Sequence, residues 1–208
     1  PAAMLSAGAQ RQCPITFRGV HRRAKIERMF IQFDADRASD SPFVERVWRC
    51  HSEGGGLFLS VASSHWEMVV TRLEGETFVT LRGPETRARE IYCPHDGEWF
   101  AVRFKAGTFM PHLPVSRLID GRDVTVPATP TSFCLNGSKW EIPTFDNAET
   151  FVGRLARAGI IARNAAVQAA LQADFVGWSP RSTQRHILRV TGMTHSVLRQ
   201  IERARHAT

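Results

Sequence analysis

Residues 177–207 read GWSPRSTQRHILRVTGMTHSVLRQIERARHA, and their pattern predicts two short helices separated by a tight turn. Ser179 is a good N-cap, and Pro180 suits the first helical position because no amide hydrogen is needed there. Gly192 is expected to end this helix, and Thr194 is expected to cap the next one. The stretch therefore predicts a compact helical pair near the end of the chain.

The two sides of the first predicted helix differ in chemistry. Thr183, Ile187 and Val190 recur at i, i+4 and i+7, so they are expected to form a narrow buried stripe. The opposite side carries, at i, i+3, i+4 and i+7, the residues Arg181, Gln184, Arg185 and Leu188. Arginine can pair bidentately with guanine, and glutamine with adenine, in a major groove that admits a helix. Spacing alone favours a solvated basic face equally.

The residues expected inward on the second helix are Val197, Leu198, Ile201 and Ala204. The basic charge of the chain is concentrated in the same region. Residues 147–208 contain nine arginines, no lysine and three acidic residues, whereas residues 1–146 are nearly neutral with 18 basic and 17 acidic side chains. This asymmetry is typical of a polyanion-binding module joined to a neutral partner domain.

Residues 42–145 are predicted to form an antiparallel β-barrel, because short apolar or alternating segments alternate there with turn signals. The expected strands are 43–50, 57–61, 65–73, 77–81, 89–93 and 99–105. Residues of the segments 57–61 and 99–104 are expected to line the interior, which is either filled or holds a small ligand. A barrel is favoured because closure leaves few exposed strand edges.

The remaining segments complete a three-part organisation. Residues 1–41 are predicted to be a flexible N-terminal arm, and residues 146–208 a helical domain. Asp146-Asn147-Ala148-Glu149 has capping-box spacing and is expected to open this domain, and Asn164 is expected to cap its second helix. The residues expected inward are Phe151, Val152, Leu155 and Ala158 in the first helix, and Val167, Ala170 and Leu171 in the second.

The C-terminal residues resemble the first helix-turn-helix motif of the AraC-type transcriptional regulators. The resemblance rests on Ser-Pro-Arg-Ser-Thr-Gln-Arg at 179–185, Thr-Gly at 191–192, and Arg203 with Ala207. It implies sequence-specific binding of double-stranded DNA, with the helix 180–190 in the major groove. The contact residues that it implies are Arg181, Ser182, Gln184, Arg185, Leu188 and Arg189. Thr183 and Ile187 stand where the family prefers leucine and phenylalanine, which predicts a smaller core.

Two further expectations follow from this resemblance. Family members carry a second motif after a linker helix, so a chain that ends at Thr208 is expected to lack it. In the other half, residues 102–109, 118–120 and 126–127 resemble the cupin-like N-terminal domain of one branch of these regulators. That domain implies a small-molecule effector or a homodimer. The expected fold class is α+β, with an N-terminal cupin-like barrel followed by an all-α helix-turn-helix domain.

Catalysis and metal binding have little support in the sequence. His65 and Glu67 form the single candidate ligand pair of a cupin-type site, and an isolated histidine is more often structural. No phosphate-binding loop, GxSxG or HExxH pattern occurs. We therefore expect no enzyme activity, no cofactor and no metal. The alternatives are a cupin-like enzyme or metal-binding sensor with a helical appendage, and a protein-interaction adaptor.

The cysteines and the hydropathy pattern indicate the cellular setting. Four cysteines are present without a CxxC pair, as in proteins of a reducing compartment, and they are expected to pack as small apolar side chains. No apolar run approaches the ~20 residues that a membrane-spanning helix needs, and no signal peptide is recognisable. We therefore expect a cytoplasmic protein that does not interact with membranes.

Overall fold

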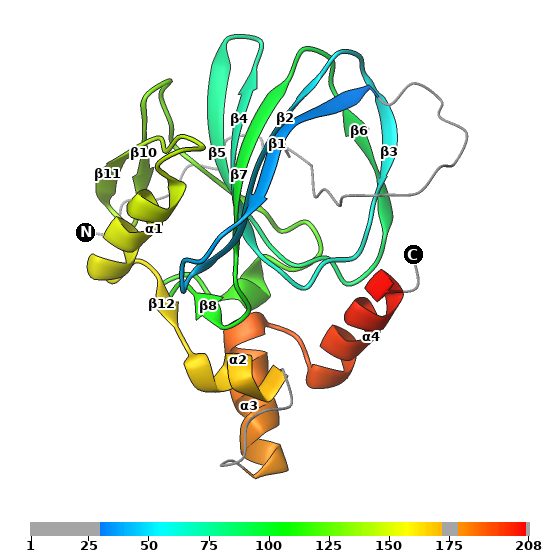
Figure 1. Ribbon diagram of the computed structural model, residues 1–208, viewed down its shortest axis with the longest axis vertical. Coiled ribbons are helices and arrows are strands. Elements are labelled where there is room, and N and C mark those ends of the chain that lie inside the picture. The colour runs from blue at the N-terminus through cyan, green and yellow to red at the C-terminus, as the bar shows by residue number, and fades with distance from the viewer. Residues whose placement is uncertain (1–29, 172–178, 207–208) are drawn as a thin grey trace, which may run out of the picture.

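The structure, a computed structural model, describes residues 30–171 and 179–206. It is a mixed α+β arrangement in which a six-stranded antiparallel sheet is accompanied by smaller sheets and four helices (Figure 1). The large sheet has, in spatial order, β1 (Ile31–Ala38), β2 (Val44–Ser52), β7 (Glu98–Phe104), β4 (Glu67–Leu73), β5 (Glu76–Arg82) and β9 (Val124–Val126).

Three two-stranded sheets and the helices complete the described chain. The pairs are β3 (Gly56–Ser60) with β6 (Arg89–Cys93), β10 (Ser132–Leu135) with β11 (Ser138–Glu141), and β8 (Thr108–Phe109) with β12 (Ala162–Arg163). The helices are the short 3₁₀ helix η1 (Val115–Arg117), α1 (Ala148–Arg157), α2 (Ala165–Leu171), α3 (Pro180–Thr191) and α4 (His195–His206).

Strand β7 lies inside the sheet and is apolar on both faces. Because side chains alternate along a strand, Trp99 and Ala101 face one way, whereas Val102 and Phe104 face the other. The first pair belongs to a cluster with Trp48 of β2, and the second pair to the larger core that α1 covers. The sheet must therefore be covered on both sides, by β3 and β6 on one and by α1, β10 and β11 on the other.

The predicted strands agree closely with the observed ones, but closure of the sheet into a barrel is not observed. Strands β1 and β9 form the two edges of the sheet and do not pair with each other in the described chain. β9 is only three residues long and pairs along Val79–Leu81 of β5, so it offers no long edge for closure. Residues 31–38, expected in the N-terminal arm, form β1 instead and pair with β2.

Every described residue of β7 after Glu98 is buried, whereas in β3 only alternate residues of the predicted lining face inward. Leu57 and Leu59 are 65% and 62% exposed, and Tyr92, which pairs with Leu57 across the small sheet, is 58% exposed. The inward positions of β3 are those of Phe58 and Ser60. A run of consecutive apolar residues does not reveal which face is buried, because a one-residue shift exchanges the faces.

Helix α1 packs under the large sheet rather than against the other helices. Phe151, Val152 and Leu155 are buried in the main core, as expected, whereas Ala158 is exposed. Asn147 precedes the helix, but its side chain accepts a hydrogen bond from the amide of Thr144 (2.8 Å) and makes no cap. The residue at the cap position is thus Asn147 rather than Asp146, and Glu149 accepts from Arg37, so the predicted capping box does not form the start of α1.

The described cysteines are free thiols in two different environments. Cys50 and Cys93 are buried in the same apolar cluster, as expected for packing residues, and burial raises the pKa of the Cys50 thiol. Cys134 is exposed, so the packing interpretation is wrong for that residue. No helix within residues 30–171 and 179–206 combines the length and apolar character needed to cross a bilayer.

An ion pair joins the first strand to α1 and makes stability depend on pH. Arg37 donates to both carboxylate oxygens of Glu149 and to the carbonyl of Phe145 (2.8 Å). The hydrogen bond from Arg37 is the main reason that the pKa of Glu149 falls from 4.5 to about 2. Because the folded-state pKa is lowered, this contribution is present above pH ~4.5 and is lost as the pH falls through about 2.

We therefore predict that Arg37→Met destabilises the protein at pH 6 and that its deficit shrinks at pH 3. Urea unfolding of both proteins at the two pH values measures the difference. Arg157→Met is the matched control, since Arg157 is exposed at the end of the same helix and makes no ion pair with the described residues. A deficit of equal size at both pH values would contradict the assigned role of Glu149.

Candidate nucleic-acid interface

Three short helices near the end of the chain are capped at the residues that the sequence predicts. The side chain of Asn164 accepts from the amide of Val167 (3.1 Å), and Ser179 Oγ accepts from the amide of Ser182 (3.2 Å). Thr194 Oγ1 accepts a hydrogen bond from the backbone amide of Val197, the third residue of α4 (3.3 Å). Each bond satisfies an amide that would otherwise lack an intrahelical partner, so these caps fix where α2, α3 and α4 begin.

The helices share a small apolar cluster. Its buried residues are Val167, Ala170, Ile187, Val190, Met193, Leu198 and Ile201. Most of the predicted stripes are confirmed, with two exceptions. Thr183 is only half-buried and donates its hydroxyl to the carbonyl of Ser179 (3.1 Å), and Ala204 is exposed. Phe109 and Ile119 pack against this cluster from the sheet side, so the helices share apolar contacts with the rest of the molecule.

The outer face of α3 carries the residues expected to contact DNA. Arg181, Gln184, Arg185 and Arg189 are exposed, Leu188 is 46% exposed, and Ser182 is half-buried. Within the described chain, no ion pair or hydrogen bond engages the three guanidinium groups of this helix. α3 contains no acidic residue. The guanidinium groups therefore keep their planar donors available for an external acceptor.

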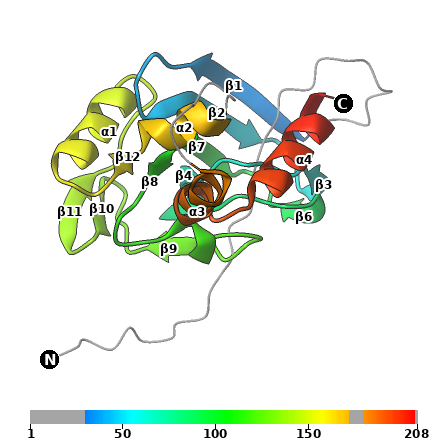
Figure 2. The same ribbon diagram turned by 90° about the horizontal axis from the view of Figure 1, so that it is seen from below.

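The end of α3 that carries Arg181 points away from the sheet. Figure 1 shows the C-terminal end of α3 next to the sheet and its N-terminal end farthest from it, and Figure 2 shows the helix nearly end-on. Gly192 determines this attachment. It has φ 74°, and a Cβ atom there would lie 2.7 Å from Ser116 Cα. The close approach fixes one end of α3, while the other end projects into solvent.

This arrangement suits insertion into a groove. In helix-turn-helix complexes the N-terminal residues of the second helix contact base edges. In α3 those positions are Arg181, Gln184 and Arg185, on the projecting end. α2 packs against α3 through the shared cluster, as a supporting helix would. The described residues therefore combine the contact chemistry with an unobstructed helix end.

The two residues of the candidate metal-ligand pair, His65 and Glu67, each contact another side chain. His65 Nε2 lies 2.9 Å from a carboxylate oxygen of Glu45, whereas Glu67 is buried and accepts from Arg103 Nε (2.6 Å). The two residues thus have different partners. In the ranges that the structure covers, no group of three or more His, Cys, Asp and Glu side chains is placed to hold a metal ion.

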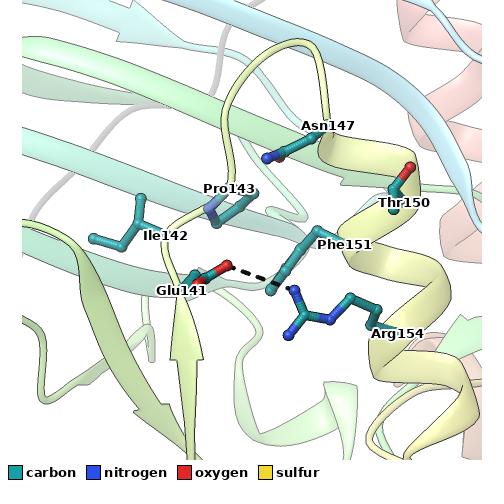
Figure 3. Close-up of a pocket in the computed structure, with 7 residues that line it drawn as sticks. All are labelled: Glu141, Ile142, Pro143, Asn147, Thr150, Phe151 and Arg154. Atoms are coloured by element: carbon teal, nitrogen blue, oxygen red, sulfur yellow. Dashed lines mark ion pairs between the residues drawn. The ribbon is translucent and has the colours of Figure 1, made fainter.

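A small cavity lies between β11 and α1. Figure 3 shows Arg154 reaching across Phe151 toward Glu141, with which it forms an ion pair at 3.7 Å. The cavity measures about 50 Å³, which holds a few water molecules at most.

A larger cleft, which the sequence did not indicate, lies between the sheet and the helices. We call it the sheet–helix cleft. It measures about 490 Å³ and is lined from the sheet side by Glu45, His65 and Lys105, and from the helix side by Gln168, His195 and Arg199, among others. These residues come from segments far apart in the chain, so no local motif could have revealed it.

The chain matches no family model, no curated protein and no solved structure.

We predict that Gly192→Ala lowers the free energy of unfolding by about 1–3 kcal/mol, because a side chain at positive φ is strained and its Cβ meets backbone. Urea unfolding measures the change. Gly153→Ala is the control, because this helical glycine of α1 has space for a Cβ atom and its replacement should stabilise by up to about 1 kcal/mol. Unchanged stability of Gly192→Ala would show that α3 is not held at this point.

Proposed function

We propose that the protein is a sequence-specific DNA-binding transcriptional regulator that inserts α3 into the major groove. The observation that carries the proposal is the exposed face of α3, whose arginines make no ion pair with the described residues and whose N-terminal end projects from the molecule. A face that served only solubility would not need an arginine–glutamine–arginine pattern at one projecting helix end. The charge asymmetry of the sequence supports the same proposal.

Each contact residue has a distinct proposed role. Arg181 and Arg185 would each bind a guanine edge, and Gln184 an adenine edge. The exposed Leu188 would pack against a thymine methyl group. Ser182 and Arg189, at the sides of the helix, would contact phosphate oxygens and set the register of the protein on the duplex.

The proposal also covers the sheet and the cellular setting. The large antiparallel sheet would act as a cupin-like sensing or dimerising unit of an AraC-type regulator, working in the cytoplasm. A single motif of this kind typically buries about 600–1,000 Å² on DNA, which is small for a specific complex. We therefore expect binding by these residues alone to be weak and strongly dependent on salt.

The first test is selection of bound fragments from a random DNA pool, followed by measurement of the affinity of variants for the selected sequence. Arg185→Ala is expected to cost about 1–3 kcal/mol, roughly 5- to 150-fold in affinity, and to relax preference at one base pair. Arg157→Ala, which removes an exposed arginine of α1, is the matched control. It should leave both the affinity and the base preference unchanged. An Arg185→Ala protein with unaltered affinity and preference would disprove the proposed reading face.

A second measurement separates phosphate contacts from base contacts. Arg189→Ala is expected to weaken binding to all sequences alike. It should also reduce the slope of the logarithm of the binding constant against the logarithm of the salt concentration by about one. Affinities measured between 50 and 200 mM salt give this slope. A change in base preference without a change in slope would assign Arg189 to the bases instead.

A further inference from the structure

The sheet–helix cleft has the dimensions of a ligand site. Its volume of about 490 Å³ falls within the range of about 300–1,000 Å³ that is usual for small-molecule pockets. Its walls belong to two parts of the fold, as is common for such pockets. Glu45 of β2 and the loop residues 64–65 and 105–106 form one wall, and α2, the end of α3 and α4 form the other.

The sheet core itself offers less room for a ligand. Trp66 stacks on Phe104 with ring centroids 3.8 Å apart, and both residues are buried. The large side chains Trp48, Met68 and Phe133 are also almost fully buried. The lining of the cleft includes no residue of the segments 57–61 and 99–104, which were predicted to line a ligand site.

We propose that the sheet–helix cleft binds a small amphipathic organic anion. The charge arrangement points to this class. Lys105 and Arg199 line the cleft from opposite walls, and no ion pair joins either of them to the described residues. The two carboxylates of the cleft have other partners: Glu45 lies 2.9 Å from His65 Nε2, and Glu202 accepts a hydrogen bond from the Ser64 hydroxyl (3.1 Å). The cations thus remain available for an anionic group of the ligand.

The apolar part of the ligand has its own contacts. Ala106, Leu171 and Leu198 contribute to the lining, and Leu198 is buried in the cluster that holds α2, α3 and α4 together. An apolar body packed there would lose water-exposed surface, while its anionic group reached Lys105 and Arg199. An uncharged ligand would form no ion pair with the two cations, and a small inorganic anion would leave the apolar lining exposed to water.

The cleft does not have the arrangement of a hydrolytic site. His65 lies between Ser64 and Glu45, as the histidine of a catalytic triad lies between its serine and its acid. However, Ser64 Oγ is 3.4 Å from His65 Nδ1 and donates its hydrogen bond to Glu202 instead. A nucleophilic serine would need its proton aimed at the histidine at about 2.6–3.2 Å. In this structure the Ser64 hydroxyl is therefore directed to Glu202 and not to His65.

Occupancy would have a structural consequence. A ligand in the cleft contacts the sheet side and α2, α3 and α4 at once, and so stabilises the docking of the helices. An effect of the ligand on DNA affinity rests on the proposed function, whereas ligand binding itself does not. The test is therefore a direct binding measurement without DNA.

The probe is 8-anilinonaphthalene-1-sulfonate, which joins an apolar body to one anionic group, and its uncharged counterpart is N-phenyl-1-naphthylamine. Fluorescence titration of the intact chain should show saturable binding of the sulfonate, with the uncharged probe binding at least tenfold more weakly. Lys105→Gln and Arg199→Gln should each weaken sulfonate binding about 5- to 10-fold, because each removes a charge-assisted contact.

Matched controls separate the cleft from other surfaces. Lys139→Gln and Arg203→Gln remove exposed cations that do not line the cleft and should leave affinity unchanged. Leu57→Ser combined with Leu59→Ser removes the exposed apolar side chains of β3, where the probe could bind nonspecifically, and should also leave affinity unchanged. Far-UV circular dichroism verifies that each variant is folded.

A variant that fills the cleft gives an independent measurement. Ala106→Phe should abolish saturable binding of the sulfonate while the circular dichroism spectrum is retained. The proposal is overturned if the two probes bind equally, if the Leu57/Leu59 double variant loses binding, or if folded Lys105→Gln, Arg199→Gln and Ala106→Phe proteins all retain full affinity.

Discussion

Strand β7 imposes the constraint on which the structure depends, because both of its faces are apolar and both must be removed from water. Trp99 and Ala101 require a cover on one side, and Val102 and Phe104 on the other. Segments from both halves of the chain supply these covers. The β3–β6 pair closes one side, and α1 closes the other together with β10 and β11. An open sheet can therefore be fully buried at its centre without closing into a barrel.

The same burial requirement positions the helices. α1 contributes its apolar stripe to the sheet core, and the following chain passes through β12, which pairs with β8 at Thr108 and Phe109. Phe109 then packs on the cluster formed by α2, α3 and α4. Gly192 permits close contact between the end of α3 and Ser116. These contacts orient α3 so that its cationic end is directed away from the sheet, which is the geometry on which the proposed DNA contacts depend.

The contacts between sheet and helices are mixed in character, and this has consequences for regulation. Apolar packing at Phe109 and Ile119 occurs in the same interface as the sheet–helix cleft, whose lining includes the polar residues His65, Lys105 and Arg199. Such an interface is less completely packed than the sheet core. A ligand that fills the cleft would add contacts between the two parts. The proposed reading helix and the proposed ligand site would then be connected through α4 and the end of α3, both of which line the cleft.

Local features of this protein were determined by the sequence alone, because they depend on residues close together in the chain. Alternation and turn residues located β2 to β7 within a few residues, and Asn164, Ser179, Thr194 and Gly192 set the limits of the helices. The helical spacing of Arg181, Gln184 and Arg185 also predicted that these side chains share one exposed face of α3. Tertiary structure alone decided the openness of the sheet, the outward facing of Leu57 and Leu59, and the separate partners of His65 and Glu67. It also brought Lys105 and Arg199 to one cleft. Each of these depends on contacts between distant segments, whose pairing and burial a sequence pattern does not encode.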